Sequence, residues 1–179
     1  MGSDGAHHAD YASFTGMARE EALQTVLDSY NALAEGQDNW VCNLANASSL
    51  LWHAYKSLPL NINWAGFYVL NNATGSDLIL GPFQGKVACQ IIKSGSGVCG
   101  TAFLTKQTQV VPDVNSFPGH IACDGETKSE IVVPIVNDAG HCLGVIDIDC
   151  IEYNGFCETD QIYLEKLADA IAHSCKFST

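Results

Sequence analysis

Three cysteines in the middle of the chain lie close to glycines in short, turn-like segments, and their thiols could support redox chemistry. Cys89 ends the stretch GKVAC, Cys99 lies within GVCG, and Cys123 lies within GHIACDG. A thiol beside glycine in a turn lies near the surface, whereas a thiol within an apolar run is ordinarily inert packing. Several accessible thiols in one small domain therefore suggest the hypothesis of thiol redox chemistry.

The neighbours of these cysteines do not decide which thiol is the nucleophile. Cys99 falls in the first turn of a predicted helix, where the helix dipole favours a thiolate. Cys123 adjoins Asp124 and lies near Glu126, and both carboxylates disfavour a thiolate. Lys128 offsets them in part. Cys157 is unassigned, and the remaining cysteines are predicted to be structural: Cys42, Cys142, Cys150 and Cys175.

Two carboxylates occur on an otherwise apolar predicted strand, LGVIDID over 143–149. Because side chains alternate, Asp147 and Asp149 share one face about 7 Å apart. Such carboxylates are costly unless they are solvated or paired with a cation. Either the strand end reaches solvent, or the pair binds a ligand ammonium or shares a proton for acid catalysis. Glu130 begins a neighbouring strand; alone it would be a rim charge, but with the aspartates it would form an acidic pocket.

Trp64 and Tyr68 are four residues apart on another predicted strand and therefore also share a face. Spacing alone favours ordinary core packing for this pair. The functional interpretation is an aromatic wall for an apolar or sulfur-bearing ligand, because sulfur–aromatic contacts are favourable by about 0.3–1.5 kcal/mol.

The composition limits the classes of partner. The 179 residues include 20 acidic and 8 basic side chains, for a net charge of −12. No basic stripe is available to neutralise phosphates, so nucleic acid is not an expected partner. The sequence has no apolar run of membrane-spanning length and no signal-peptide pattern, which predicts no membrane partner and a cytoplasmic, or additionally nuclear, location. In a reducing cytosol a disulfide is expected to be transient and catalytic.

Zinc binding is one alternative for the cysteines. His120 and Cys123, with Cys89 and Cys99, could supply four ligands, but their spacing is loose and no CxxC motif accompanies them. The sequence also lacks a dinucleotide-binding glycine motif, a P-loop and an HExxH motif. We therefore predict neither a metal nor an organic cofactor.

The elements that must position these residues follow from hydrophobic periodicity and turn residues. We predict a flexible tail over 1–15, a single domain over 16–179 and a long polar loop over 113–128. Helices are predicted over 17–34, 40–58, 98–104 and 159–174, the last capped by Thr159. Strands are predicted over 63–70, 77–80, 87–92, 109–111, 131–136 and 143–148. Hairpin connections indicate an α+β fold in which helices flank a mainly antiparallel sheet.

Six ordered blocks carry a family resemblance that is more specific than any single motif. They are NWAGFY (63–68), GPFQGKVAC (81–89), GSGVCGTA (95–102), VPDVNSFPGHIACD (111–124), SEIVVP (129–134) and LGVIDID (143–149). Over roughly residues 20–175 the chain resembles the free methionine-(R)-sulfoxide reductases, single-domain proteins of the GAF fold, and is most similar to the fungal members. The resemblance implies a six-stranded antiparallel sheet flanked by helices, with a closed pocket on one face.

The resemblance also implies roles for particular residues. Cys123 would be the nucleophile and Cys89 the resolving cysteine, with Cys99 able to take either part. The substrate would be bound by an aromatic wall and a carboxylate cluster: Trp64, Tyr68, Glu130, Asp147 and Asp149. The expected substrate is free methionine sulfoxide, the expected reductant is thioredoxin, and the resemblance is compatible with a homodimer. The alternative function is a GAF-type small-molecule sensor without catalysis.

Overall fold

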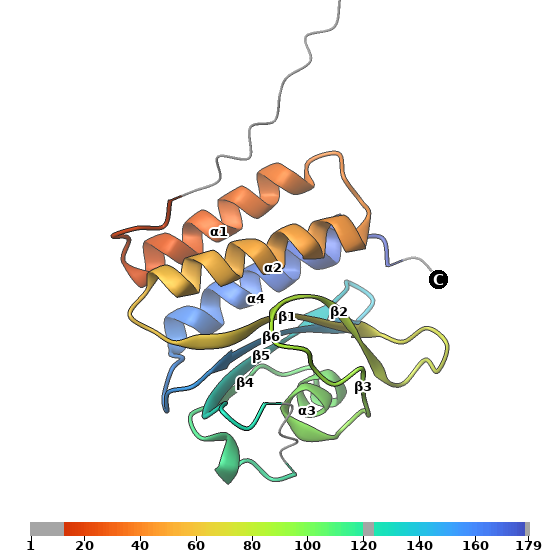
Figure 1. The fold of residues 1–179 in the computed structure, drawn as a ribbon. Coiled ribbons are helices and arrows are strands. Elements are labelled where there is room, and N and C mark those ends of the chain that lie inside the picture. The colour runs from red at the N-terminus through yellow and green to blue at the C-terminus, as the bar shows by residue number, and fades with distance from the viewer. Residues whose placement is uncertain (1–12, 120–123, 178–179) are drawn as a thin grey trace, which may run out of the picture.

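One antiparallel sheet of six strands separates the described part of the chain into two sides (Figure 1). The computed structural model describes residues 13–119 and 124–177. Its helices are α1 (Arg19–Ala34), α2 (Trp40–Ser57), α3 (Gly97–Thr105) and α4 (Glu158–Ser174), with a short 3₁₀ turn over Val114–Ser116. Its strands are β1 (Ile62–Leu70), β2 (Leu78–Gly85), β3 (Ile91–Ile92), β4 (Gln109–Val111), β5 (Ser129–Val136) and β6 (Cys142–Cys150).

The strand order is β3-β2-β1-β6-β5-β4, and every strand pairing is antiparallel. Helices α1, α2 and α4 lie on one side of the sheet, whereas α3 and the long connections around it lie on the other (Figure 1). The predicted α+β fold is therefore confirmed. The central pair, β1 and β6, joins segments far apart in the sequence, so hairpin signals could not predict it.

The predicted boundaries were wrong in several places; β5 and β6, for example, are each longer than predicted. Strand β3 is limited to Ile91–Ile92, because residues 86–89 leave the ladder, although the Gln90 carbonyl still accepts a 3.0 Å hydrogen bond from the Leu80 N–H of β2. Strand β2 continues through Pro82 to Gly85 instead of ending near residue 80. Helix α4 begins at Glu158 with Cys157, not Thr159, as its N-cap, because the Cys157 backbone N–H donates to Asp160 Oδ2 at 2.7 Å.

Strand alternation decides which side chains reach each layer. The residues that β1 turns toward the three-helix side are Ala65, Phe67 and Val69, and those of β6 are Ile146 and Ile148; all are buried in the larger core cluster. The opposite faces of the same strands carry Trp64, Tyr68 and Val145 into a smaller cluster under α3. The face of the sheet toward α1, α2 and α4 therefore forms the main hydrophobic core, whereas the opposite face lines the space beneath α3.

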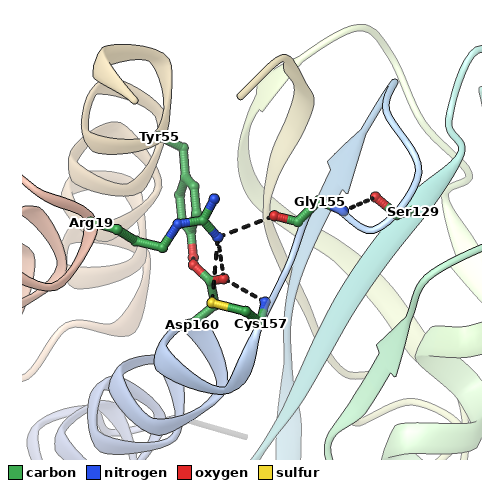
Figure 2. Close-up of polar contacts among 6 residues, drawn as sticks. All are labelled: Arg19, Tyr55, Ser129, Gly155, Cys157 and Asp160. Atoms are coloured by element: carbon green, nitrogen blue, oxygen red, sulfur yellow. Dashed lines mark hydrogen bonds and ion pairs between the residues drawn. The ribbon is translucent and has the colours of Figure 1, made fainter. Parts of the chain in front are cut away.

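A partly buried ion pair connects the helices of the three-helix side (Figure 2). Asp160 of α4 is fully buried and pairs with Arg19 of α1 at 2.5 Å. Its other oxygen accepts a 2.8 Å hydrogen bond from Tyr55 of α2. Arg19 also donates to the Gly155 carbonyl, and the Gly155 N–H donates to Ser129 at the start of β5. One carboxylate therefore links three helices to the loop beside β5.

Two sequence predictions concern the termini and the membrane. Residues 1–12 of the predicted tail lie outside the described residues, while Phe14 is buried in the larger core. Within 13–119 and 124–177, no helix has both the length and the apolar character needed to cross a bilayer.

Candidate active site

A cavity of about 160 Å³ lies on the α3 side of the sheet, large enough for one small molecule. Its floor is formed by β1, β5 and β6, one wall by the start of α3, and the rim by residues 86–93 and 124–127. Seven of the eight predicted site residues line it: Trp64, Tyr68, Cys89, Cys99, Glu130, Asp147 and Asp149. The eighth, Cys123, lies outside the described residues.

The aromatic wall is continuous across two strands. The Trp64 ring stacks on Tyr68 with centroids 5.7 Å apart and on Phe83 of β2 at 5.2 Å. Phe83 can approach because its partner in the ladder is Gly66, where a Cβ atom would lie only 2.3 Å from the Phe83 Cβ. Both Trp64 and Tyr68 are almost fully buried, and both face the cavity.

The same aromatic side chains hold the segment that carries Cys89. Trp64 Nε1 donates to the Lys86 carbonyl at 3.2 Å, and Tyr68 Oη donates to the Cys89 carbonyl at 3.0 Å. These bonds explain why residues 86–89 leave the β2–β3 ladder. Cys89 is half-buried at the rim and takes part in a disulfide bond. A disulfide-bonded sulfur is thus held over the aromatic wall.

The strand register brings the acidic residues together on the cavity floor. Glu130 of β5 lies opposite Asp149 of β6, and Asp147 lies opposite Gly66 of β1, between the positions of Trp64 and Tyr68. Glu130 and Asp147 are each 6% exposed. The interpretations of Asp147 as a solvated strand end and of Glu130 as a rim charge are therefore wrong, and the acidic pocket is confirmed.

Cys99 completes this cluster from the start of α3. Its Sγ lies 3.9 Å from Glu130 Oε1, and one ligand atom each of Cys99, Glu130 and Asp147 lie within 4.8 Å of one another. Asp147 Oδ1 is buried and has no hydrogen-bond partner among the described residues. A buried acceptor without a donor is costly, so this oxygen is suited to a ligand that carries N–H donors or positive charge.

Burial dominates the electrostatics of the cluster. It raises the pKa of Asp147 to about 6. The pKa of Glu130 is raised well above its usual value by burial and by the neighbouring charges of Asp147 and Asp149. The pKa of Asp149 is likewise raised, by burial and by the charges of Asp147 and Asp124. At neutral pH the site therefore combines at least one ionised carboxylate with a carboxyl group that retains a proton easily.

The prediction that the helix dipole favours a Cys99 thiolate was wrong. Cys99 does lie in the first turn of α3, but its side chain is buried, and burial raises the pKa of its thiol well above the usual value. The carboxylates of Asp147 and Glu130 raise the pKa further, since a thiolate beside them would be repelled. Desolvation and like charge together outweigh the half-charge of a helix terminus.

Sequence reasoning missed the polar residues that connect the two rim segments. Lys86 contacts Asp124 at 3.7 Å and Glu126 at 2.5 Å. Asn63 donates to Asp124 at 3.2 Å and to Thr127 at 3.0 Å. The pKa of Asp124 is lowered chiefly by a hydrogen bond from the Glu126 backbone N–H, and the contacts with Asn63 and Lys86 lower it further. The available signal was the opposite charge of Lys86, near Cys89, and of Asp124 and Glu126, near Cys123.

The structure does not support a zinc site formed by His120, Cys123, Cys89 and Cys99. His120 and Cys123 lie outside the described residues, and the sulfur of Cys89 is in a disulfide, which is not a thiolate ligand.

Comparison with known proteins agrees with this geometry. Residues 18–174 match the family model of the GAF domain. The chain is 63% identical over 179 residues, 99% of each chain, to the free methionine-R-sulfoxide reductase of Saccharomyces cerevisiae. It is 47% identical over 151 residues, 84% of this chain and 87% of the relative, to the enzyme of the same name from Escherichia coli. A solved free methionine-R-sulfoxide reductase from Neisseria meningitidis, in complex with its substrate, superposes with a TM-score of 0.83 at 38% identity and covers 92% of this chain and 95% of that one.

The fold and the cavity beneath α3 thus define a GAF-domain protein. Within that class, the chain belongs to the free methionine-R-sulfoxide reductases, which are oxidoreductases, and the yeast enzyme is one of its fungal relatives.

Proposed function

We propose that the protein reduces free methionine-(R)-sulfoxide to methionine with Cys123 as nucleophile and Cys89 as resolving cysteine, and that thioredoxin regenerates the two thiols. The observation that carries this proposal is the disulfide-bonded Cys89 at the rim of a cavity with an aromatic wall and a buried carboxylate cluster. Six other cysteines are free thiols: Cys42, Cys99, Cys142, Cys150, Cys157 and Cys175. Oxidation at Cys89 is therefore selective and is not a general property of the cysteines.

The substrate ammonium would pair with the ionised member of the cluster, for which the unpartnered Asp147 Oδ1 is the best-placed acceptor. The methyl sulfoxide would then lie against Trp64, where a sulfur–aromatic contact is favourable. A free α-ammonium is charged, whereas the corresponding nitrogen of a peptide residue is a neutral amide. The acidic cluster therefore supports preference for the free amino acid, because only a cation compensates a buried carboxylate fully.

The chemistry needs one proton donor and two thiols. The Cys123 thiolate attacks the sulfoxide sulfur and forms an S–Sγ bond while the sulfoxide oxygen takes up a proton. The oxygen then passes from the methionine sulfur to Sγ, so that the S–O and S–Sγ bonds both break and methionine leaves with Cys123 as a sulfenic acid. Glu130 is the favoured proton donor, directly or through water or a neighbouring aspartate, because its raised pKa keeps a proton available. The Cys89 thiol then condenses with the sulfenic acid, which releases water and forms the disulfide. Thioredoxin reduces this disulfide by thiol–disulfide exchange.

Thiol titration tests the reaction class. Fully reduced protein, freed of reductant, is treated with excess free methionine-(R)-sulfoxide, and the remaining thiols are counted. We expect the loss of two thiols and the formation of one methionine per chain. A sensor would bind the sulfoxide and lose no thiols, and that result would contradict the reductase proposal.

A cysteine series assigns the individual roles. Cys123→Ser is expected to abolish turnover, whereas Cys89→Ser should produce one methionine per chain and stop at a sulfenic acid that a dimedone probe traps. Cys42→Ser, at an exposed cysteine distant in sequence from the three, is the matched control and should turn over normally. Multiple turnovers by Cys123→Ser would instead make Cys99 the nucleophile.

Substrate affinity should depend on pH in a direction set by Asp147. Its pKa of about 6 means that the carboxylate is mostly protonated at pH 5 and mostly ionised at pH 7. If the ammonium requires the ionised form, the substrate should bind about tenfold more weakly at pH 5 than at pH 7. Equilibrium binding to Cys123→Ser, which does not turn over, measures this without interference from thiol chemistry. The same measurement on Cys123→Ser with Asp147→Asn should show a nearly flat profile; equal pH dependence in both would contradict the assignment.

A further inference from the structure

We propose that Cys99, Glu130 and Asp147 form a Zn²⁺ site within the cavity, and that bound Zn²⁺ and the substrate exclude each other. The three side chains come from α3, β5 and β6 and converge from two sides of the cavity. The exclusion rests on the proposed function, because it requires the substrate ammonium to use the same carboxylates. The metal site itself rests only on the geometry.

The positions of the ligand atoms are close to those that a tetrahedral zinc centre needs. Zinc binds thiolate sulfur at about 2.3 Å and carboxylate oxygen at about 2.0–2.2 Å, which places ligand atoms roughly 3.4–3.7 Å apart. The Sγ of Cys99 and Oε1 of Glu130 are 3.9 Å apart, and all three ligand atoms lie within 4.8 Å. Side-chain rotations that move the ligand atoms by less than about 1 Å would bring them to these separations. The cavity leaves the fourth coordination position for water.

An independent observation indicates that the cluster receives a cation. Asp147 is 6% exposed, yet its Oδ1 atom has no hydrogen-bond partner among the described residues. Two more carboxylates, Glu130 and Asp149, lie nearby on the sheet. A cation would satisfy the orphaned oxygen and reduce the repulsion among these groups at once.

The donor set selects zinc over the more abundant hard cations. Magnesium and calcium prefer all-oxygen ligands, whereas a thiolate beside carboxylates suits Zn²⁺. Binding forms a metal–Sγ bond, and the thiol proton of Cys99 leaves to solvent. No oxidant or reductant is involved. The metal is here an inhibitor rather than a cofactor, because it would use the thiol and the carboxylates that face the substrate.

The oxidised protein, with its Cys89 disulfide intact, is the form to test. In this form Cys89 cannot act as a thiolate ligand, and no turnover interferes. Co²⁺ serves as the spectroscopic probe, because a cobalt–thiolate bond gives a charge-transfer absorption band. We expect this band to saturate at one equivalent of Co²⁺, and Zn²⁺ to displace the Co²⁺. Absence of the band would overturn the site.

Matched variants assign the ligands. Cys99→Ser should abolish the band and weaken Zn²⁺ binding, measured against a chromophoric chelator, by more than the roughly 10–100-fold that loss of an outer-shell contact costs. Cys42→Ser should bind like the wild type. Unchanged binding by Cys99→Ser, or loss of the band in Cys42→Ser, would overturn the assignment. If circular dichroism shows Cys99→Ser to be unfolded, the Zn²⁺ affinities of Glu130→Gln and Asp147→Asn test the assignment instead. Wild-type affinity in both variants would overturn the assignment.

The exclusion is tested separately. Free methionine-(R)-sulfoxide added to the Co²⁺-loaded oxidised protein should release the metal and bleach the band. A band that persists at saturating sulfoxide would overturn the exclusion. Reductase activity measured with the metal chelated tests the proposed function alone, so an active enzyme that binds no metal would refute only the metal site.

Discussion

Replacing Asp147 by Asn is expected to lower kcat/KM for free methionine-(R)-sulfoxide by about 100-fold while stabilising the substrate-free protein. Removing one partner of a buried charge pair costs about 2–5 kcal/mol, and each 1.4 kcal/mol is about tenfold in affinity. In the substrate-free cavity, however, the Asp147 carboxylate has an oxygen without a partner and lies beside Glu130. A neutral amide of the same shape removes the buried charge and can donate to the neighbouring carboxylates.

The stability gain of Asp147→Asn should depend on pH in a defined direction. The pKa of Asp147 is raised to about 6 by burial, so the folded protein binds the proton more tightly than the unfolded chain does. Stability is therefore lost as the pH rises from about 4 to about 6, where the folded state must give up this proton. The variant avoids that loss, so its advantage, about 3 kcal/mol for a pKa raised from 3.8 to about 6, should be full above pH 6 and vanish below pH 4.

Steady-state kinetics measures the expected loss of kcat/KM, and urea denaturation at several pH values measures the expected gain in stability. Asp138→Asn is the matched control, because the Asp138 side chain is 88% exposed and far from the cavity lining. It should change neither quantity appreciably. Loss of activity accompanied by loss of stability in Asp147→Asn would mean that Asp147 supports the fold instead of the substrate.

Replacing Asp160 by Ala is expected to reduce the free energy of unfolding by about 3 kcal/mol without altering the chemistry at the cavity. Removing one partner of a buried ion pair costs roughly 3–5 kcal/mol, and the lower end applies because the Arg19 side chain is 28% exposed. The variant also leaves Tyr55 without its acceptor and Cys157 N–H without its cap (Figure 2).

Asp38→Ala provides the comparison for this prediction. Asp38 forms an ion pair with Lys176 at 2.5 Å, but both side chains are more than half exposed, so solvent screens the interaction and a much smaller loss is expected. Urea denaturation midpoints give the difference, and kcat/KM measured well below the melting temperature should be unchanged in both variants. Equal losses of stability in the two variants would contradict a special role for the buried Asp160.

Local patterns in the sequence predicted most of the elements, because helical and strand periodicities are properties of neighbouring residues. They also predicted which pairs share a face, since side chains on a strand alternate: Trp64 with Tyr68, and Asp147 with Asp149. The family resemblance added the roles of the cysteines. Residue types and spacing thus indicated the components of the site before any strand was paired.

Only the tertiary structure decided how those components meet. Pairing of β1 with β6, segments about eighty residues apart, places Asp147 between the positions of Trp64 and Tyr68. Packing of α3 over the sheet buries Cys99 among carboxylates, which reverses the thiol acidity that its helix position predicted. Burial and long-range strand register determine the pKa values of the site residues and leave Asp147 Oδ1 without a hydrogen-bond donor among the described residues. Burial and register depend on residues far apart in the sequence, so the neighbours of a residue in the sequence do not reveal them.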